Sequence, residues 1–99
     1  MFTEIASITI DPARAAEFEA AVAEAAPHFR AAAGCHGMAL ERVVEEPAHY
    51  RLIVRWATVE DHVVHFRNSE GFTRWRALAG PYFAAPPAVI HSAEVARFF

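Results

Sequence analysis

Titratable and aromatic side chains are concentrated in one part of the chain, between residues 55 and 76. The group comprises Trp56, His62, His65, Phe66, Trp75 and Arg76. An imidazole exchanges a proton near neutral pH, and aromatic rings suit the walls of an apolar pocket. On a helix, residues three positions apart are neighbours, so His62 and His65 would both reach a ligand between helix and sheet. We therefore expect His62 and His65 to be catalytic and the other four residues to bind the substrate.

A purely structural role is the main alternative for these residues. Val63 and Phe66 already give the predicted helix a buried stripe, so either histidine could lie at the edge of the core. Its N–H groups would then be bonded to the backbone or to water. Trp56 at a strand end is also typical of a protein core, where the indole N–H needs a hydrogen-bond partner.

The sequence gives little support for metal binding, covalent catalysis or a nucleotide cofactor. Two ligands could come from the histidine pair, and a third from His36, His49, His91, Glu60 or Asp61. However, no tight metal spacing such as H-E-x-x-H occurs. Cys35 and His36 would point to opposite faces of a strand, so they would not act together as nucleophile and base. The four glycines are scattered along the chain and do not form a nucleotide-binding loop. We therefore expect no metal and no cofactor, although the histidines leave haem open as an alternative.

The hydrophobic pattern indicates which elements hold these residues. Residues 2–10 have the β-branched composition of a strand. Asp11 and Pro12 suit the N-cap and first position of a helix, whose apolar residues recur at spacings of three and four. This helix is predicted to reach about residue 32 and to end at Gly34. Pro27 within it indicates a kink or an early end.

The rest of the chain supplies three strands and a divided helical segment. Strands are predicted for residues 36–45 and 50–56, a short helix for 59–67, a further helix capped by Ser69, and a last strand for 89–95. The order β-α-β-β-α-β predicts a ferredoxin-like split βαβ arrangement. This is an α+β fold with an antiparallel sheet and both helical layers on one face.

Length and composition predict one domain, residues 1–99, that pairs with a copy of itself. The chain is 55% hydrophobic and 21% charged, an apolar surplus too large for so small a core. We expect two bare sheet faces to stack about a two-fold axis as a dimeric α+β barrel. The net charge of −3 is interspersed, which indicates no nucleic-acid or membrane partner. A lone cysteine and the absence of leader-like or membrane-length segments predict a cytoplasmic protein.

Several short motifs follow one another along the chain. They are Gly34-Cys35-His36-Gly37 after the first helix, Arg55-Trp56 at a strand end, His65-Phe66, and then Phe72. In these motifs the chain resembles the antibiotic biosynthesis monooxygenase family over nearly its whole length. The resemblance implies a dimeric α+β barrel. Activities in that family include oxygenation of anthrones or quinols without metal or flavin, haem breakdown, and isomerisation of a phosphorylated signalling molecule.

The branches of that family match different residues. Trp56 and Arg76 match the anthrone-oxidising branch, whereas Leu52 and His62 replace its Asn and Tyr. His65 and Trp75 stand where the haem-degrading branch has a Trp and a His, with the two types exchanged. The resemblance implies a cofactor-independent monooxygenase of a small aromatic, phenolic or quinol-like substrate. A non-catalytic or stress-response dimer that binds a small apolar ligand is the alternative, and haem binding or degradation is a further one.

Overall fold

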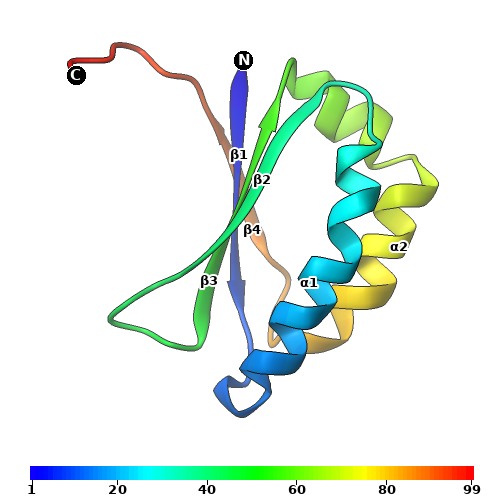
Figure 1. Ribbon diagram of the computed structural model, residues 1–99, viewed down its shortest axis with the longest axis vertical. Helices are drawn as coiled ribbons and strands as arrows, with labels where there is room; N and C mark the ends of the chain where they lie inside the picture. Colours follow the sequence, from blue (N-terminus) through cyan, green and yellow to red (C-terminus); the bar gives the residue numbers. More distant parts are fainter.

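A four-stranded antiparallel sheet carries two helices on one of its faces (Figure 1). The computed structural model describes all residues, 1–99. The strands are β1 (Phe2–Thr9), β2 (Cys35–Arg42), β3 (His49–Trp56) and β4 (Ala88–Ser92), in the sheet order β2-β3-β1-β4. The helices are α1 (Ala15–Arg30) and α2 (Glu70–Ala79), with shorter helical segments η1 (Pro12–Arg14), η2 (Asp61–Phe66) and η3 (Gly80–Tyr82). The predicted α+β fold and its β-α-β-β-α-β order are confirmed.

Side chains alternate along the two central strands, and this alternation places the core on the helix side. Glu4, Ala6 and Ile8 are the buried residues of β1, and Tyr50, Leu52, Val54 and Trp56 are those of β3. Successive side chains of a strand point to opposite faces, so all seven face α1 and α2. One of the seven is an acid, Glu4.

Helix α1 forms as its sequence pattern predicts. The Oδ1 of Asp11 accepts the N–H of Ala13 at 3.0 Å, which caps the helical turn η1 ahead of α1. The predicted apolar stripe is buried, at Phe18, Val22, Ala25 and Phe29. Pro27 does not end the helix, which continues to Arg30.

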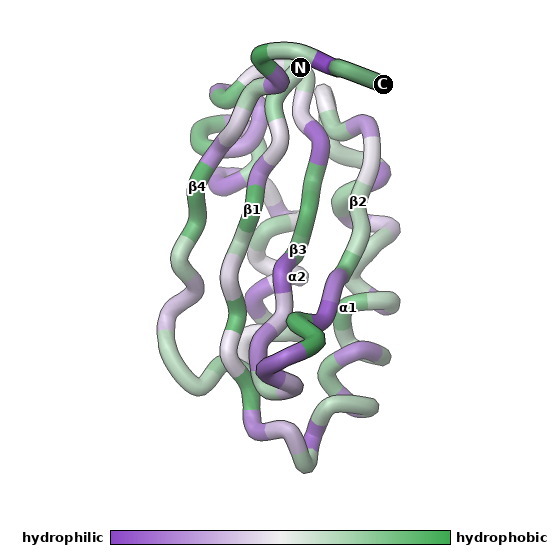
Figure 2. Tube along the Cα trace, turned by 90° about the vertical axis from the view of Figure 1, so that its left-hand side faces the viewer, coloured by the Kyte–Doolittle hydropathy of each residue, from purple (hydrophilic) through white to green (hydrophobic).

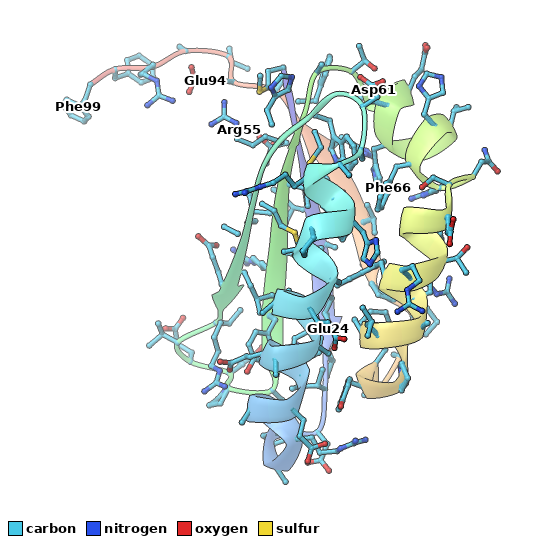
Figure 3. The ribbon with its side chains drawn as sticks, turned by 45° about the vertical axis from the view of Figure 1, so that its right-hand side comes forward. Glu24, Arg55, Asp61, Phe66, Glu94 and Phe99 are labelled. Carbon is cyan, nitrogen blue, oxygen red and sulfur yellow. The ribbon has the colours of Figure 1, made fainter.

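The turn between α1 and β2 depends on glycine. Gly34 has a φ of +80°, which L-residues rarely adopt. A Cβ atom at this position would also collide with the Asp61 carboxylate of η2. Figure 3 shows Asp61 at the end of the molecule where this turn approaches η2. Gly34 therefore brings the start of β2 close to the segment that carries His62.

The short helix predicted for residues 59–67 is present, but it has an unusual geometry. Over Asp61–Phe66 it is a π-helix, in which the N–H of Arg67 donates to the carbonyl of His62 at 3.2 Å. Backbone bonds that span five residues make a turn wider than that of an α-helix. Ser69 then caps α2 as predicted, because its Oγ accepts the N–H of Phe72 at 3.3 Å.

The last strand is shorter than predicted. The sequence pattern suggests residues 89–95, but β4 ends at Ser92. Ser92 pairs with Thr3, next to the first residue of β1, so later residues have no partner strand. Residues 93–99 instead form an extended tail that leaves the sheet on the side away from the helices (Figures 1 and 3). Phe98 and Phe99 on this tail are exposed.

The second face of the sheet has no cover within the chain, and Figure 2 looks onto it. Ile5 lies opposite both Ile53 and Ile90, and Ala39 lies opposite Ile53. These four side chains form an apolar row across all four strands. No helix of the protein combines the length and the apolar character needed to cross a bilayer.

Candidate active site

A cavity of about 790 Å³ lies on the helix side of the sheet, next to α2 and the segment that leads into β4. Its apolar lining includes Ile8, Leu52, Phe72, Trp75, Phe83 and Val89. Its titratable or charged lining residues are Glu4, His62, Arg67 and Arg76. An apolar cavity with few convergent polar groups is typical of a small-molecule site.

His62 connects the cavity to the interior of the protein. Its side chain is only 4% exposed and stacks on the Trp56 ring, with centroids 5.3 Å apart and an interplanar angle of 15°. The Nδ1 of His62 is hydrogen-bonded to the Nε2 of His91 at 2.8 Å. Its Nε2 lies 3.3 Å from the Oε1 of Glu4. Both ring nitrogens therefore lie next to groups that accept or donate protons.

Strand pairing brings Glu4 to the same place. Glu4 of β1 is the register partner of His91 of β4, so their side chains share the helix-facing side of the sheet. The Oε1 of Glu4 accepts the indole N–H of Trp56 at 3.0 Å. The sequence does indicate that Glu4 is buried, because it lies on the same face of β1 as the buried residues Ala6 and Ile8. We did not identify Glu4 from the sequence as a site residue.

Burial changes the protonation of this group. It lowers the pKa of His62 to about 4, and the charges of Arg67 and His91 act in the same direction. Burial also raises the pKa of Glu4, against the opposing effects of the Trp56 hydrogen bond and the Arg67 charge. The pKa of His91 is lowered by burial and by Arg67. At neutral pH His62 is therefore an uncharged imidazole, and its contact with Glu4 is not an ion pair.

Two arginines give the cavity positive charge. Arg67 follows η2 and Arg76 lies on α2, and neither forms a salt bridge within the chain. The Arg76 guanidinium lies 5.9 Å from the centroid of the Phe72 ring. Glu4 is the only acid in the lining. This arrangement favours a ligand that carries or develops negative charge.

Three of the six residues expected from the sequence line the cavity. They are His62, Trp75 and Arg76. Trp56 lies behind His62 and is fully buried, and Phe66 packs between Phe29 and Trp56 at centroid distances of 4.7 and 5.3 Å. These two rings support the site from the core and do not contribute to its lining. Figure 3 shows Phe66 directed inward from η2.

The expected meeting of His62 and His65 at one ligand does not occur. The side chain of His65 is 64% exposed, and its Nδ1 lies 3.2 Å from the Oδ1 of Asp61. The π-helix explains the separation. In its wide turn, residues four apart align better than residues three apart, so His62 is buried with Phe66 while His65 lies beside Asp61.

Sequence reasoning missed Glu4, Arg67 and the site role of His91. The sequence suggests His91 only as a third metal ligand, but no three His, Cys, Asp or Glu side chains are grouped so as to hold a metal ion. What the site offers is an uncharged imidazole beside a carboxyl group, apolar walls, and two unpaired cations. These groups suit removal of a proton from a weakly acidic aromatic compound, such as a phenol, and stabilisation of the resulting anion.

Comparisons with known proteins agree with this architecture. A family model described as antibiotic biosynthesis monooxygenase matches residues 1–78. The uncharacterised protein YczJ of Bacillus subtilis (strain 168) is 35% identical over 95 residues, which are 96% of this chain and 100% of that protein. A candidate antibiotic biosynthesis monooxygenase of Bordetella bronchiseptica has a solved structure with 52% identity and a TM-score of 0.93, over 96% of this chain and 97% of that one. Another, from Caulobacter crescentus CB15, has 25% identity and a TM-score of 0.82, over 96% and 90% of the two chains.

Proposed function

The chain belongs to the antibiotic biosynthesis monooxygenase family, and on this basis we propose that it oxidises a small phenolic or quinol-like aromatic substrate with O₂. No cofactor takes part in the proposed reaction. The observation that carries the proposal is the placement of His62 beside Glu4 at an apolar cavity that also holds Arg67 and Arg76. The pair provides a proton acceptor, and the arginines provide charge for an anion.

The proposed reaction begins with removal of a proton from the substrate by the Nε2 of His62. Arg67 and Arg76 stabilise the anion that forms. Such an anion is electron-rich enough to reduce O₂ directly. For a quinol, one oxygen atom remains in a hydroxyquinone product and the other leaves as water. The substrate supplies both electron pairs needed, so no external reductant is required.

The size and the aromatic lining of the cavity support a planar aromatic substrate. Its volume of about 790 Å³ falls within the usual range for small-molecule sites, roughly 300–1,000 Å³. Trp75, Phe72 and Phe83 contribute flat apolar surfaces. We propose that an aromatic ring packs against these side chains with its hydroxyl directed toward His62.

We also propose that the working form is a cytoplasmic homodimer joined through the uncovered sheet face. The apolar row of Ala39, Ile53, Ile5 and Ile90 is continuous across that face. The β2–β3 connection and the tail at residues 93–99 both extend to the same side (Figure 1). A second copy stacked there buries the row and the exposed apolar residues of the tail together. The free thiol of Cys35 suits a reducing compartment.

Oxygen uptake with a panel of hydroquinones and anthrones tests the proposed reaction. The sharpest comparison is His62→Ala against His65→Ala, because both histidines belong to η2 and only His62 lines the cavity. We expect His62→Ala to lose activity by about 100-fold or more, the usual contribution of a positioned base. His65→Ala should keep wild-type activity. Equal rates for the two variants would contradict the proposal.

A non-catalytic ligand-binding role is the second candidate, and the aromatic and aliphatic side chains in the lining favour it. Tight binding of an aromatic compound with no oxygen uptake from any member of the panel would support this role. Haem is a further alternative: its axial ligand would be the Nε2 of His62, the same nitrogen that the proposed reaction uses as its base.

A further inference from the structure

A short path of polar groups leads from the cavity to the edge of the sheet. His62 lines the cavity, and its Nδ1 is hydrogen-bonded to the Nε2 of His91 at 2.8 Å. His91 belongs to β4, which is an edge strand. The Nδ1 of His91 makes no hydrogen bond within the chain, yet the protein contains no buried side-chain nitrogen without a partner. That nitrogen is therefore open to solvent.

We propose that His91 is a proton-relay residue that connects His62 to water at the β4 edge. The proposal rests on the proposed function, because it describes where the proton taken from the substrate goes. His91 touches neither substrate nor cavity, and it acts through its hydrogen bond to His62.

The relay moves one proton without placing a charge on either ring. His62 starts with its proton on Nδ1, donated to the Nε2 of His91, and with a free lone pair on Nε2. As Nε2 takes the substrate's proton, the Nδ1 proton passes to His91, which releases its own Nδ1 proton to water. Each imidazole gains one proton and loses one. The new N–H of His62 then lies beside the carboxyl group of Glu4.

The surroundings of His62 explain why a relay is needed. Arg67 after η2 and His91 on β4 both disfavour a positive charge on His62, and burial acts in the same direction. Glu4 on β1 faces the His62 ring, and Trp56 on β3 stacks on it. Burial raises the pKa of the Cys35 thiol on β2, and Cys35 lies close enough to Glu4 for the charge of that carboxyl group to raise it further. An imidazole that resists the charged state accepts a proton readily only if it loses another at the same time.

The reverse transfer has a use in the same reaction. It returns both rings to their starting tautomers and brings one proton from water into the cavity. The oxygen atom that leaves as water needs that proton. One path thus serves both removal of the substrate proton and protonation of reduced oxygen.

Nitrogen-15 NMR of the histidine rings tests the relay without any substrate. In the wild-type protein we expect His62 to be uncharged, with its proton on Nδ1 and hydrogen-bonded to the Nε2 of His91. His91→Ala should expose that proton to rapid exchange and move the pKa of His62 upward toward its ordinary value. His36→Ala should change neither, because His36 is exposed and forms no side-chain hydrogen bond. Unchanged tautomer, exchange and titration of His62 in His91→Ala would overturn the proposal.

A second variant separates the relay from simple support. His91→Gln keeps an acceptor for the His62 Nδ1 proton but cannot pass a proton onward. With a substrate that the wild-type protein oxidises, we expect kcat to fall by roughly tenfold with KM little changed, and added imidazole to restore part of it. Wild-type kcat in His91→Gln, or a loss that imidazole does not relieve, would overturn the relay. If the wild-type protein consumes no oxygen, the proposed function fails, and the NMR experiment still decides whether His91 holds the Nδ1 proton of His62.

Discussion

Glu4 and His91 are paired directly across β1 and β4, and His62 approaches both of them from the π-helix above the sheet. The pairing is a consequence of strand register, which the backbone hydrogen bonds of the sheet determine. The positions of both residues are therefore fixed more firmly than the conformation of a surface side chain. The carboxyl group and the second imidazole are thus held on rigid elements. Such placement suits a site that must position protons accurately.

Stability should fall in mildly acidic solution because of His62. Its pKa is about 4 in the folded protein against 6.5 for an unperturbed histidine. Below pH 6.5 the unfolded chain therefore binds a proton that the folded protein does not, and stability is lost as the pH falls from 6.5 toward 4. The full difference corresponds to roughly 3 kcal/mol. Urea unfolding at pH 7 and pH 4.5 measures it, and the difference should shrink in His62→Gln but persist in His36→Gln.

Trp56 should matter for its indole N–H as well as for its bulk. Trp56→Phe keeps an aromatic ring in the core but removes the hydrogen bond to Glu4, which is buried. Leaving that carboxyl group without its donor should cost about 1–3 kcal/mol in addition to the loss of ring volume. The pKa of Glu4 should rise further, which NMR can follow. Trp75→Phe is the matched control, since Trp75 lines the cavity without bonding to Glu4, and an equal effect on Glu4 would contradict this role.

Gly34→Ala should destabilise the protein strongly, whereas Gly80→Ala should not. Position 34 combines a φ of +80° with a close approach to Asp61, so a methyl group is both strained and obstructed. We expect a loss of roughly 2–4 kcal/mol in the free energy of unfolding. Gly80 has a helical φ of −54° and open space around it, so alanine there should be neutral or slightly stabilising. Asp61→Ala should relieve part of the loss in Gly34→Ala, and additive effects would show that the two residues do not collide.

The uncovered sheet face should be the site of self-association. Ile53→Arg places a charge in the middle of the apolar row and should convert a dimer into monomers in light scattering after gel filtration. The charged side chain points away from the core, so the monomer should still fold. Ala20→Arg on the exposed surface of α1 should leave the dimer intact. A wild-type protein that elutes as a monomer at high concentration would exclude a stable dimer.

The sequence was sufficient for the fold because local signals agree with one another. Asp11 and Ser69 cap helices as the sequence predicts, and Gly34 lies at the turn between α1 and β2. The end of β4 was not predictable from its own residues. β4 ends where its partner strand β1 begins, at the pair of Ser92 and Thr3. The strand pairing determines this end, whereas the apolar residues of β4 itself do not.

The site was only partly predictable, and the reason is geometric. His62, Trp75 and Arg76 were identified as chemically able residues in a helical segment, and the cavity brings them together. The error over His65 came from assuming an α-helix, because residue types do not distinguish an α-turn from a π-turn. Glu4 was visible as an acid in phase with buried positions of β1. Its partners on β3, β4 and η2 depend on tertiary packing.

The π-helix has a consequence for variants that lose or gain a residue. Its backbone bonds reach one residue further than those of an α-helix, so loss of a single residue from Asp61–Phe66 would rewind this segment as an ordinary helical turn and rotate the side chains within it. A different position would then face the cavity while the sheet and both long helices kept their places. In this part of the fold, insertion or deletion of one codon changes the chemistry of the site more than most single substitutions can.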